Sequence, residues 1–282
     1  MNPIIQRMRN RLLCYDRNLL GIFAGPTGSG KSESALRLAL LLNPDFTTDH
    51  VVFTVEDFFS LLNSNTLKAG DVIVWEEMGI AADSRTFFSL QNRAITYVFE
   101  SFRFKNLAVL MNVPGLRMID SRVQRLCHYY FETVKIMRRK KLCRNKVFEL
   151  QYNGRNNKIY FHYPEVVLDG VVKRVEALDF LKPPDYIVEP YLDLKRKFTE
   201  ELNIGLELQI KDAKIDKSSK PKDVSAIVAE VVSNPGDYIH IRGGERRVKV
   251  GLIQGIFDVG RPTAAKARDL IEHKLMREDS GF

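Results

Sequence analysis

Cysteine is scarce in this sequence, and its few cysteines form no pattern that indicates cross-links or metal ligands. Cys14, Cys127 and Cys143 are widely spaced, and none belongs to a C-x-x-C pair or a His/Cys cluster. An odd number of isolated cysteines predicts neither a disulfide framework nor a zinc site. We therefore expect reduced thiols and a cytoplasmic location, which would be a host cytoplasm if the protein is viral.

Long apolar runs are also missing. The longest, such as LALLLN and NLAVLMNV, are far shorter than the roughly 18 to 20 residues that a membrane-spanning helix needs. The N-terminal stretch MNPIIQRMRNRLL is interrupted by arginines and contains no apolar signal core. The sequence therefore predicts no transmembrane segment.

Acidic residues are the minority among the charged residues. Lys and Arg number 43 against 35 Asp and Glu, which gives a formal net charge of +8. Such an excess favours polyanionic partners, although a basic surface can also serve solubility alone. A hydrophobic content of 45% is high enough for a globular protein with a real core.

The first part of the chain alternates short apolar segments with helical ones. Strands are predicted at residues 18–24, 50–55, 71–75, 106–114 and 128–137, and helices at 32–42, 56–64 and 84–104. This alternation predicts an α/β fold with a mainly parallel sheet covered by helices on both faces.

The segment GPTGSGKS, residues 25–32, matches the phosphate-binding pattern G-x-x-x-x-G-K-[ST] between a predicted strand and a predicted helix. Glycines let the backbone wrap a phosphate, and the helix that follows adds its positive N-terminus. Lys31 would reach the β- and γ-phosphates, and Ser32 would offer its hydroxyl to Mg²⁺. The expected cofactors are ATP and Mg²⁺, and the expected binding set is Gly25, Pro26, Thr27, Gly28, Ser29, Gly30, Lys31, Ser32 and Glu33.

Two adjacent acids end the apolar strand DVIVW about 45 residues further on. We expect Glu76, with Ser32, to hold Mg²⁺, and Glu77 to polarise the attacking water as a general base. The alternative is that both are exposed acids at a strand end. Asn112, at the end of the next strand, is the candidate sensor of the γ-phosphate, unless it is merely a polar residue leaving a strand for a turn.

Hydrolysis in such a site usually needs an arginine from a neighbouring subunit. The candidates among the arginines after the acids are Arg85, Arg103, Arg122 and Arg125, and Arg85 and Arg122 are preferred. For each of them a surface or nucleic-acid contact is the alternative.

The segments GPTGSGKS, KAGDVIVWEEMGIAADSR, NRAITYVFESFRFKNLAVLMNVPGLRMIDSRVQRLCHYYFET and KPPDYIVEPY resemble the HerA/FtsK branch of P-loop ATPases over about residues 15–205. More narrowly, they are similar to archaeal and viral ATP-binding proteins termed zonular occludens toxin-like. The resemblance implies a RecA-like core, a ring or other homo-oligomer, and ATP-driven movement of DNA or a filament-like cargo. Glu76 departs from the usual aspartate, and Asn112 stands where glutamine or threonine is commoner. The filamentous-phage relatives carry a transmembrane helix, so its predicted absence here favours a DNA role over secretion.

Three segments make up the predicted domain organisation. Residues 1–210 form a P-loop ATPase domain, with a β-hairpin insertion at about 135–165 around the Asn153-Gly154 turn. Residues 211–222 are Lys-rich and predict a solvated linker. Residues 223–282 form a second, smaller domain.

The second domain contains a helix–turn–helix pattern over VGLIQGIFDVGRPTAAKARDLIEHKL. Asp258 stands at the turn, Pro262 opens the second helix, and Ala264, Ala267, Leu270 and Ile271 form its apolar stripe. In a (winged) helix-turn-helix domain, basic residues on the outer face would contact DNA. The candidates are Arg246, Arg247, Lys249, Arg261, Thr263, Lys266 and Arg268. A helical hairpin used only for packing or oligomerisation is the alternative.

The sequence is compatible with three functions. The first is a motor that translocates or packages double-stranded DNA. The second is a DNA-binding regulator or partition factor switched by ATP, and the third is an assembly-type NTPase without DNA binding.

Overall fold

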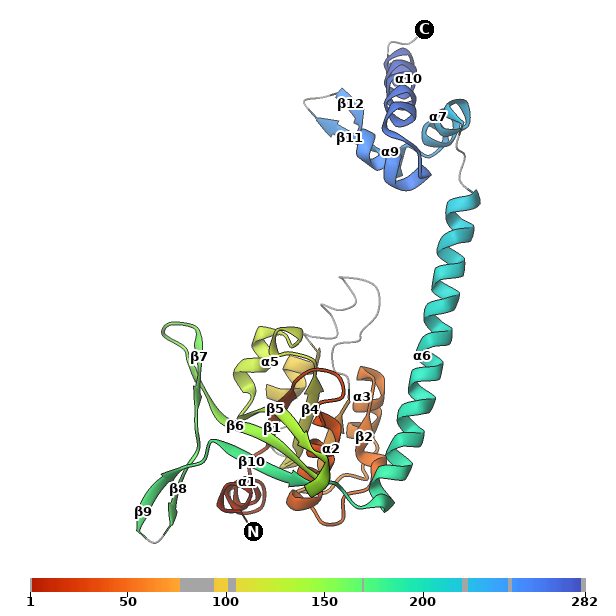
Figure 1. Ribbon diagram of the computed structural model, residues 1–282. Coiled ribbons are helices and arrows are strands. Elements are labelled where there is room, and N and C mark those ends of the chain that lie inside the picture. Colours follow the sequence, from red (N-terminus) through yellow and green to blue (C-terminus); the bar gives the residue numbers. More distant parts are fainter. Residues whose placement is uncertain are drawn as a thin grey trace. The chain divides into compact units, whose positions relative to one another are not determined.

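The computed structural model describes residues 2–76, 94–100, 105–168, 170–219, 223–242 and 245–279 (Figure 1). The chain divides into two compact units, Met1–Phe198 and Thr199–Phe282. Helix α6 (Asp185–Ser219) begins in the first unit and continues past residue 198. Its last nine residues, 211–219, belong to the segment predicted as a linker. Lys, Asp, Ala and Ile are tolerated in helices, and the breaker Pro221 comes only after them. Across these ranges, no helix combines the length and the apolar character that crossing a bilayer requires.

Unit 1 is built on an eight-stranded sheet in the order β10-β6-β5-β1-β4-β3-β2, with β7 paired to β6. Strands β2, β3, β4, β1 and β5 are parallel neighbours, so the predicted α/β class is confirmed. The strand bounds are β1 Leu19–Ala24, β2 Val51–Val52, β3 Val72–Trp75, β4 Ala108–Val113, β5 Tyr129–Met137, β6 Leu142–Asn153, β7 Lys158–His162 and β10 Ala177–Leu181. A separate hairpin is formed by β8 Glu165–Leu168 and β9 Val171–Arg174.

The predicted hairpin exists, but it is not an insertion outside the sheet. β6 pairs antiparallel with β5 along most of its length and also pairs with β10. The turn between β6 and β7 is also longer than an Asn153-Gly154 turn, because Asn153 pairs with Lys158 and leaves residues 154–157 as the loop. The edge of the parallel sheet is therefore closed by antiparallel strands.

Alternate residues of the central strands face opposite sides of the sheet, as the two-residue period of a strand requires. In β1, Leu19 and Phe23 join one hydrophobic cluster, whereas Leu20 and Ile22 join the other. Continuous apolar segments such as LLGIFA are thus explained by burial on both faces.

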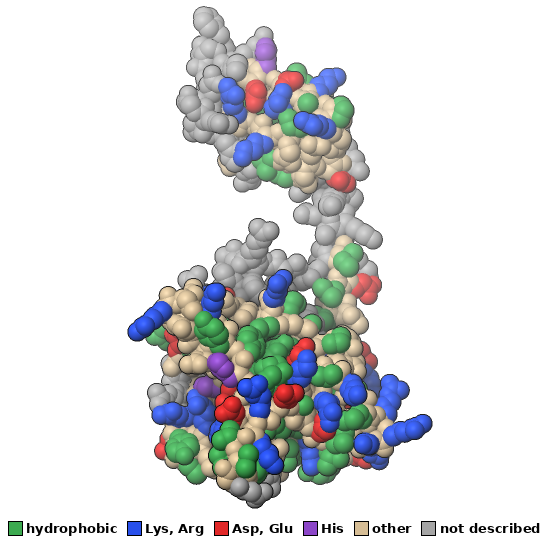
Figure 2. Space-filling view, turned by 60° about the vertical axis from the view of Figure 1, so that its left-hand side comes forward, with side chains coloured by type: hydrophobic (Ala, Val, Ile, Leu, Met, Phe, Trp, Pro, Cys, Tyr) green, Lys and Arg blue, Asp and Glu red, His purple; other side chains and the backbone are tan. Residues whose placement is uncertain are grey.

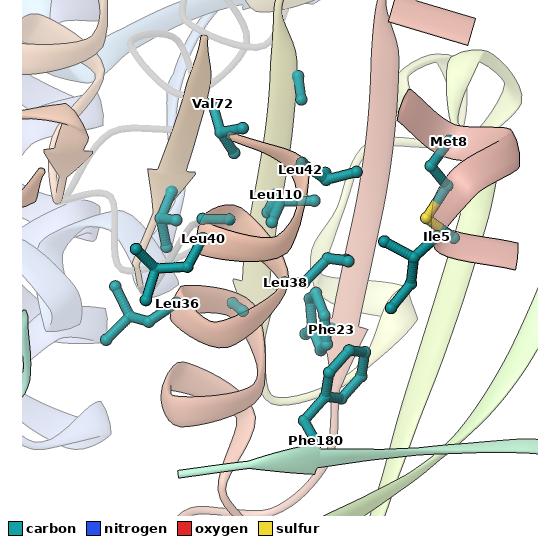
Figure 3. Packing of buried hydrophobic residues seen from close by; sticks show 14 of the residues in the cluster. Ile5, Met8, Phe23, Leu36, Leu38, Leu40, Leu42, Val72, Leu110 and Phe180 are labelled. Carbon is teal, nitrogen blue, oxygen red and sulfur yellow. The ribbon is translucent and has the colours of Figure 1, made fainter. Parts of the chain in front are cut away.

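Helices cover both of these faces. On one side α1 (Pro3–Leu13) and α2 (Lys31–Leu42) contribute apolar side chains, and on the other α3 (Val55–Asn63), residues 94–100 and α5 (Ser121–Leu126) do so. Figure 3 shows labelled side chains of α1 and α2 gathered beside Phe23 of β1 and Phe180 of β10. Phe23 stacks on Phe131 with ring centroids 4.4 Å apart.

Strand β2 is shorter than the predicted segment 50–55, and the reason lies in the next helix. The Thr54 side chain accepts a hydrogen bond from the backbone N–H of Asp57, and the Asp57 carboxylate accepts one from the backbone N–H of Thr54. This capping box starts α3 at Val55. The strand therefore ends before Thr54.

Unit 2 has its own hydrophobic core. It consists of α7 (Val224–Ser233), α8 (Pro235–Tyr238), the hairpin β11 (Ile239–Arg242) and β12 (Glu245–Val248), α9 (Val250–Phe257) and α10 (Arg261–Asp279). Ile253, Phe257 and Ala264 are among its buried residues. Leu270, placed by the sequence in the apolar stripe, is 45% exposed. The stripe continues through Ile271 and Leu275 instead, which follow Ala264 by about two and three helical turns and so lie on the same face.

A buried histidine makes unit 1 sensitive to pH. The Nδ1 atom of His128 accepts a hydrogen bond from the backbone N–H of Leu20 at 3.0 Å, and the Arg11 guanidinium lies against Nε2. Burial, and then the Arg11 charge, lower the pKa of His128 to about 3 from its usual 6.5. The imidazole is therefore neutral in the folded protein at neutral pH.

Because the unfolded chain takes up this proton below pH 6.5 and the folded chain does not, stability is retained above 6.5 and is lost as the pH falls toward 3. Between pH 6 and 5 we expect the free energy of unfolding to fall by about 1 kcal/mol per pH unit from this group. Urea unfolding at several pH values measures it. His128→Gln, which keeps an acceptor for the Leu20 N–H, should show a shallower slope; equal slopes would contradict the assignment.

Candidate nucleotide-binding site

The glycine loop joins β1 to α2 at the carboxyl edge of the parallel strands. Gly28 and Gly30 have φ of +76° and +95°, in the left-handed region that favours glycine. A Cβ atom on Gly30 would lie 2.7 Å from the Cys143 sulfur, whereas one on Gly28 would meet no atom within 4 Å. The loop is thus packed on the sheet at Gly30 and open at Gly28.

Polar groups on β5 and β6 form buried hydrogen bonds with the loop and with the start of α2. Asn145 donates from Nδ2 to the Ser34 hydroxyl at 3.0 Å, and its Oδ1 accepts from the Thr133 hydroxyl at 2.9 Å. The Cys143 thiol donates to the Ser29 carbonyl at 3.4 Å. Burial raises the pKa of Cys143, so it stays a thiol at neutral pH. These contacts fix the loop to the antiparallel half of the sheet.

Lys31 is the first residue of α2 and folds back over the loop. Its Nζ atom donates to the carbonyl oxygens of Gly25 at 2.7 Å and Pro26 at 2.9 Å. The first N–H groups of any α-helix have no partner within the helix and favour an anion in front of them. An ammonium and a helix N-terminus therefore converge on the space above the loop.

Glu76 follows β3 directly, and its side chain is only 1% exposed. Its Oε2 atom accepts a hydrogen bond from the Ser32 hydroxyl at 2.9 Å, and its Oε1 atom accepts one from Asn112 Nδ2 at 2.6 Å. Asn112 lies on β4, the strand that separates β1 from β3. The glycine loop, the acid after β3 and the polar residue on the intervening strand thus meet at one edge of the sheet.

The strand order and the glycine loop after β1 fit a RecA-like P-loop fold. A cavity of about 490 Å³ opens in front of this P-loop. Its polar side is formed by the P-loop with Glu76 and Asn112, and its apolar side includes Pro114, Met118 and Ile136. The remaining wall comes from α6, through Val188, Tyr191, Leu192 and Lys195.

The oxygen atoms of this site fit a magnesium ion that is bound together with a nucleotide. The Ser32 hydroxyl and the Glu76 carboxylate face each other, and Mg²⁺ is usually held by one or two protein oxygens plus phosphate and water. Within the part of the chain that the structure describes, no group of three or more His, Cys, Asp or Glu side chains could hold a metal ion by itself. The P-loop site therefore suits a cation that arrives with its own oxygen ligands.

Most of the residues predicted for nucleotide binding do come together. Lys31, Ser32, Glu76 and Asn112 line the cavity, as do Thr27, Gly28, Gly30 and Glu33. Pro26 contributes its carbonyl to Lys31. Ser29 has a buried hydroxyl with no hydrogen-bond partner among the described atoms.

The arginine predictions are placed differently. Arg122 donates from Nε to Asp120 at 3.1 Å, and its side chain is about half exposed. This hydrogen bond lowers the pKa of Asp120, which caps α5, and Arg122 is not among the residues that line the cavity. Arg125 lies 5.1 Å from the centre of the Tyr152 ring. Glu77, Arg85 and Arg103 lie outside the described residues.

The sequence did not indicate the contribution of α6. Lys195 Nζ lies 3.9 Å from Oε2 of Glu76 and 5.9 Å from the Tyr191 ring centre. Val188, Tyr191, Leu192 and Lys195 follow the helical spacing i, i+3, i+4, i+7, which places them on one face. That spacing was the one sequence feature that could have indicated this face of α6. A lysine on a helix is usually solvated, however, and Lys195 belongs to no recognised motif.

The residues predicted to contact DNA lie in unit 2. Arg247, Lys249, Arg261 and Lys266 are exposed, and Thr263 and Arg268 are partly buried. Arg268 donates to the Asp269 carboxylate at 2.6 Å. The side chain of Arg246 is not described. The backbone N–H of Val248 donates to Glu272 at 3.3 Å, which joins the β11–β12 hairpin to α10. Figure 2 shows several Lys and Arg side chains on one face of unit 2, with a few acids among them.

Neither a scan of protein-family models nor a search of curated proteins gives a match to this sequence. Among solved structures, the N-terminal domain of zonular occludens toxin from Neisseria meningitidis is 9% identical with a TM-score of 0.33, covering 52% of this chain and 94% of that chain. The E. coli MS115-1 HORMA:CdnC:Trip13 complex is 19% identical with a TM-score of 0.27, covering 45% and 55%. Both scores are below 0.5, so no property is transferred from either structure.

Proposed function

We propose that this chain binds ATP with Mg²⁺ and hydrolyses it. The observation that carries the proposal is the buried Glu76 carboxylate, held between the Ser32 hydroxyl and the Asn112 amide in front of a glycine loop. Asn112 and Ser32 orient the acid, and the Lys31 ammonium, which donates to the Gly25 and Pro26 carbonyls, stands at the loop where it can turn to phosphate oxygens. Bound Mg²⁺ would neutralise charge that develops on the phosphates.

The general base is assigned to Glu77. Both oxygens of Glu76 are already engaged, whereas a base needs a free acceptor for the proton of the attacking water. Glu77 is the next acid along the chain. Arg85 and Arg122 remain the preferred candidates for the arginine that a neighbouring subunit would contribute.

The proposed role for this hydrolysis is to drive a DNA motor of the HerA/FtsK type, which translocates or packages duplex DNA as a ring. Support comes from the sequence resemblance, the net charge of +8 and the exposed Arg247, Lys249, Arg261 and Lys266 of unit 2. In this role α10 would present its outer face to the major groove, and the β11–β12 hairpin would hold phosphates.

Hydrolysis measured with and without duplex DNA tests the motor function. We expect random-sequence duplex to stimulate turnover several-fold and ATP to promote oligomer formation, followed by light scattering. Arg261→Ala combined with Lys266→Ala should weaken DNA binding and the stimulation while basal turnover stays unchanged. A monomer whose turnover ignores DNA would contradict the motor, whereas an oligomer that does not bind DNA would favour the assembly-type NTPase.

An ATP-switched regulator or partition factor is the second candidate, favoured by the fact that unit 2 has a core of its own. The two functions differ in sequence preference. A motor should bind random duplexes about equally at fixed salt, whereas a regulator should prefer one short site by a factor on the order of a thousand or more.

A further inference from the structure

Helix α6 follows the carboxyl edge of the sheet, in front of the P-loop. It begins just after β10, which runs in the same direction as β1 because two antiparallel pairings separate them. Further along, Phe198 stacks on Phe53, the residue after β2, with ring centroids 4.7 Å apart. β10 and β2 are the first and last strands of the sheet order. The first half of α6 therefore passes along the edge where the nucleotide site lies.

The face that α6 turns toward the cavity is apolar except at its far end. Val188 and Tyr191 are buried against the core of unit 1, and Leu192 completes the apolar part. Lys195 comes next on this face and directs its ammonium to Glu76. This lysine is therefore the group through which α6 touches the acid of the site.

Ser32 and Lys195 meet Glu76 at the same carboxylate oxygen, Oε2. The Ser32 hydroxyl and this carboxylate are also the oxygens that fit Mg²⁺. Two cations beside one oxygen repel each other, and that repulsion is poorly screened around a carboxylate that is only 1% exposed. The Lys195 ammonium and a divalent cation therefore compete for Glu76.

We propose that Lys195 is a positioning residue of the nucleotide site, which pairs with Glu76 in the nucleotide-free protein and moves to the terminal phosphate when Mg–ATP binds. The proposal rests on the ATP-binding function above. The lysine side chain has four rotatable bonds and three donors, so the ammonium can change partner while the helix backbone stays in place. A diphosphate lacks the terminal oxygens that would receive it. Lys195 thus gives α6 a contact that distinguishes ATP from ADP.

Equilibrium binding tests the proposal without relying on turnover. Trp75 is the only tryptophan and directly precedes Glu76, so its fluorescence is a native reporter of the site. In Lys195→Met we expect Mg–ATP to bind about tenfold more weakly, as one lost charge-assisted contact predicts, and Mg–ADP to change less than about twofold. Mg²⁺ alone should bind more tightly than to the wild type, because the competing ammonium is gone.

Two matched variants accompany this measurement. Lys197→Met removes an exposed lysine two residues along the same helix and should match the wild type in every titration. Lys195→Arg keeps the charge and should restore most of the preference for ATP over ADP. A general packing defect would weaken ATP and ADP together and would not raise the affinity for Mg²⁺.

The outcomes separate this inference from the function on which it rests. If the wild type binds neither nucleotide, both proposals fail. If it binds Mg–ATP and Lys195→Met behaves like Lys197→Met, the ATP-binding function stands and the role of Lys195 is wrong. If Lys195→Met binds ATP and ADP equally weakly, the lysine contributes to the site without distinguishing the two nucleotides, and the proposal is again wrong.

Discussion

Glu77→Gln is expected to lower ATP turnover by a factor on the order of 10²–10⁴ while leaving the affinity for Mg–ATP within about twofold of the wild type. Glutamine preserves the shape of the side chain and removes its capacity to take a proton. The acid before it is occupied, because the two oxygens of Glu76 accept hydrogen bonds from Ser32 and Asn112. Single-turnover hydrolysis and equilibrium binding, measured on the same preparation, separate the two quantities.

Glu76→Gln is the matched comparison. It removes the charge that Ser32, Asn112 and Lys195 surround, so we expect the affinity for Mg–ATP to fall by about 10- to 100-fold. Affinity for ATP in the absence of Mg²⁺ should change much less. If Glu77→Gln loses binding and Glu76→Gln loses only turnover, the metal-holding and base roles are assigned to the wrong residues.

Gly30→Ala is expected to give the second large effect, on both folding and nucleotide affinity. The left-handed φ of +95° costs an alanine about 1–2 kcal/mol. The new Cβ atom would also lie 2.7 Å from the Cys143 sulfur and 3.1 Å from Ile136, and overpacking of this kind costs about a further 1–3 kcal/mol. Urea unfolding measures the sum of the backbone and overpacking costs. Nucleotide titration measures the loss of affinity that the distorted P-loop should cause.

Gly28→Ala serves as the control for this prediction. It has a comparable φ of +76° but open space around the new Cβ, so it should show only the backbone cost. Adding Cys143→Ala to Gly30→Ala should recover much of the steric part. Equal destabilisation by the Gly28 and Gly30 substitutions would show that packing against Cys143 does not matter.

The parts of unit 1 that the sequence predicted well are those with strong local signals. The segment LLGIFA is apolar at every position, so it predicts a strand buried on both faces, and the structure places it at the centre of the sheet. The Gly-Lys-Ser pattern requires a loop and a helix start at fixed positions. The positions of Glu76 and Asn112 could also be predicted, because each lies at or near the end of a predicted strand.

What the sequence did not predict depends on contacts between distant segments. Lys195 belongs to the site only because α6 follows the same edge of the sheet as Glu76, and that path is set by the antiparallel strands β6 and β10. Residues 135–165 looked like an insertion, because nothing local shows that Cys143 and Asn145 pack against the P-loop and the start of α2. Strand β2 ends early because Thr54 and Asp57 form the capping box that starts α3. From the sequence alone, Thr54 and Val55 fit equally well as the last residues of an apolar strand.

The helix α1 has a consequence for the order in which the nascent chain can fold. Its buried residues Ile4, Ile5, Met8 and Leu12 share one hydrophobic cluster with Phe180 and Tyr191, near the other end of unit 1. During synthesis α1 leaves the ribosome together with its neighbours β1 and α2, whereas Phe180 and Tyr191 follow only after nearly the whole unit has been translated. The hydrophobic cluster on this face of the sheet is therefore complete only after Tyr191 has been synthesised, and contacts of such long sequence separation favour slow folding.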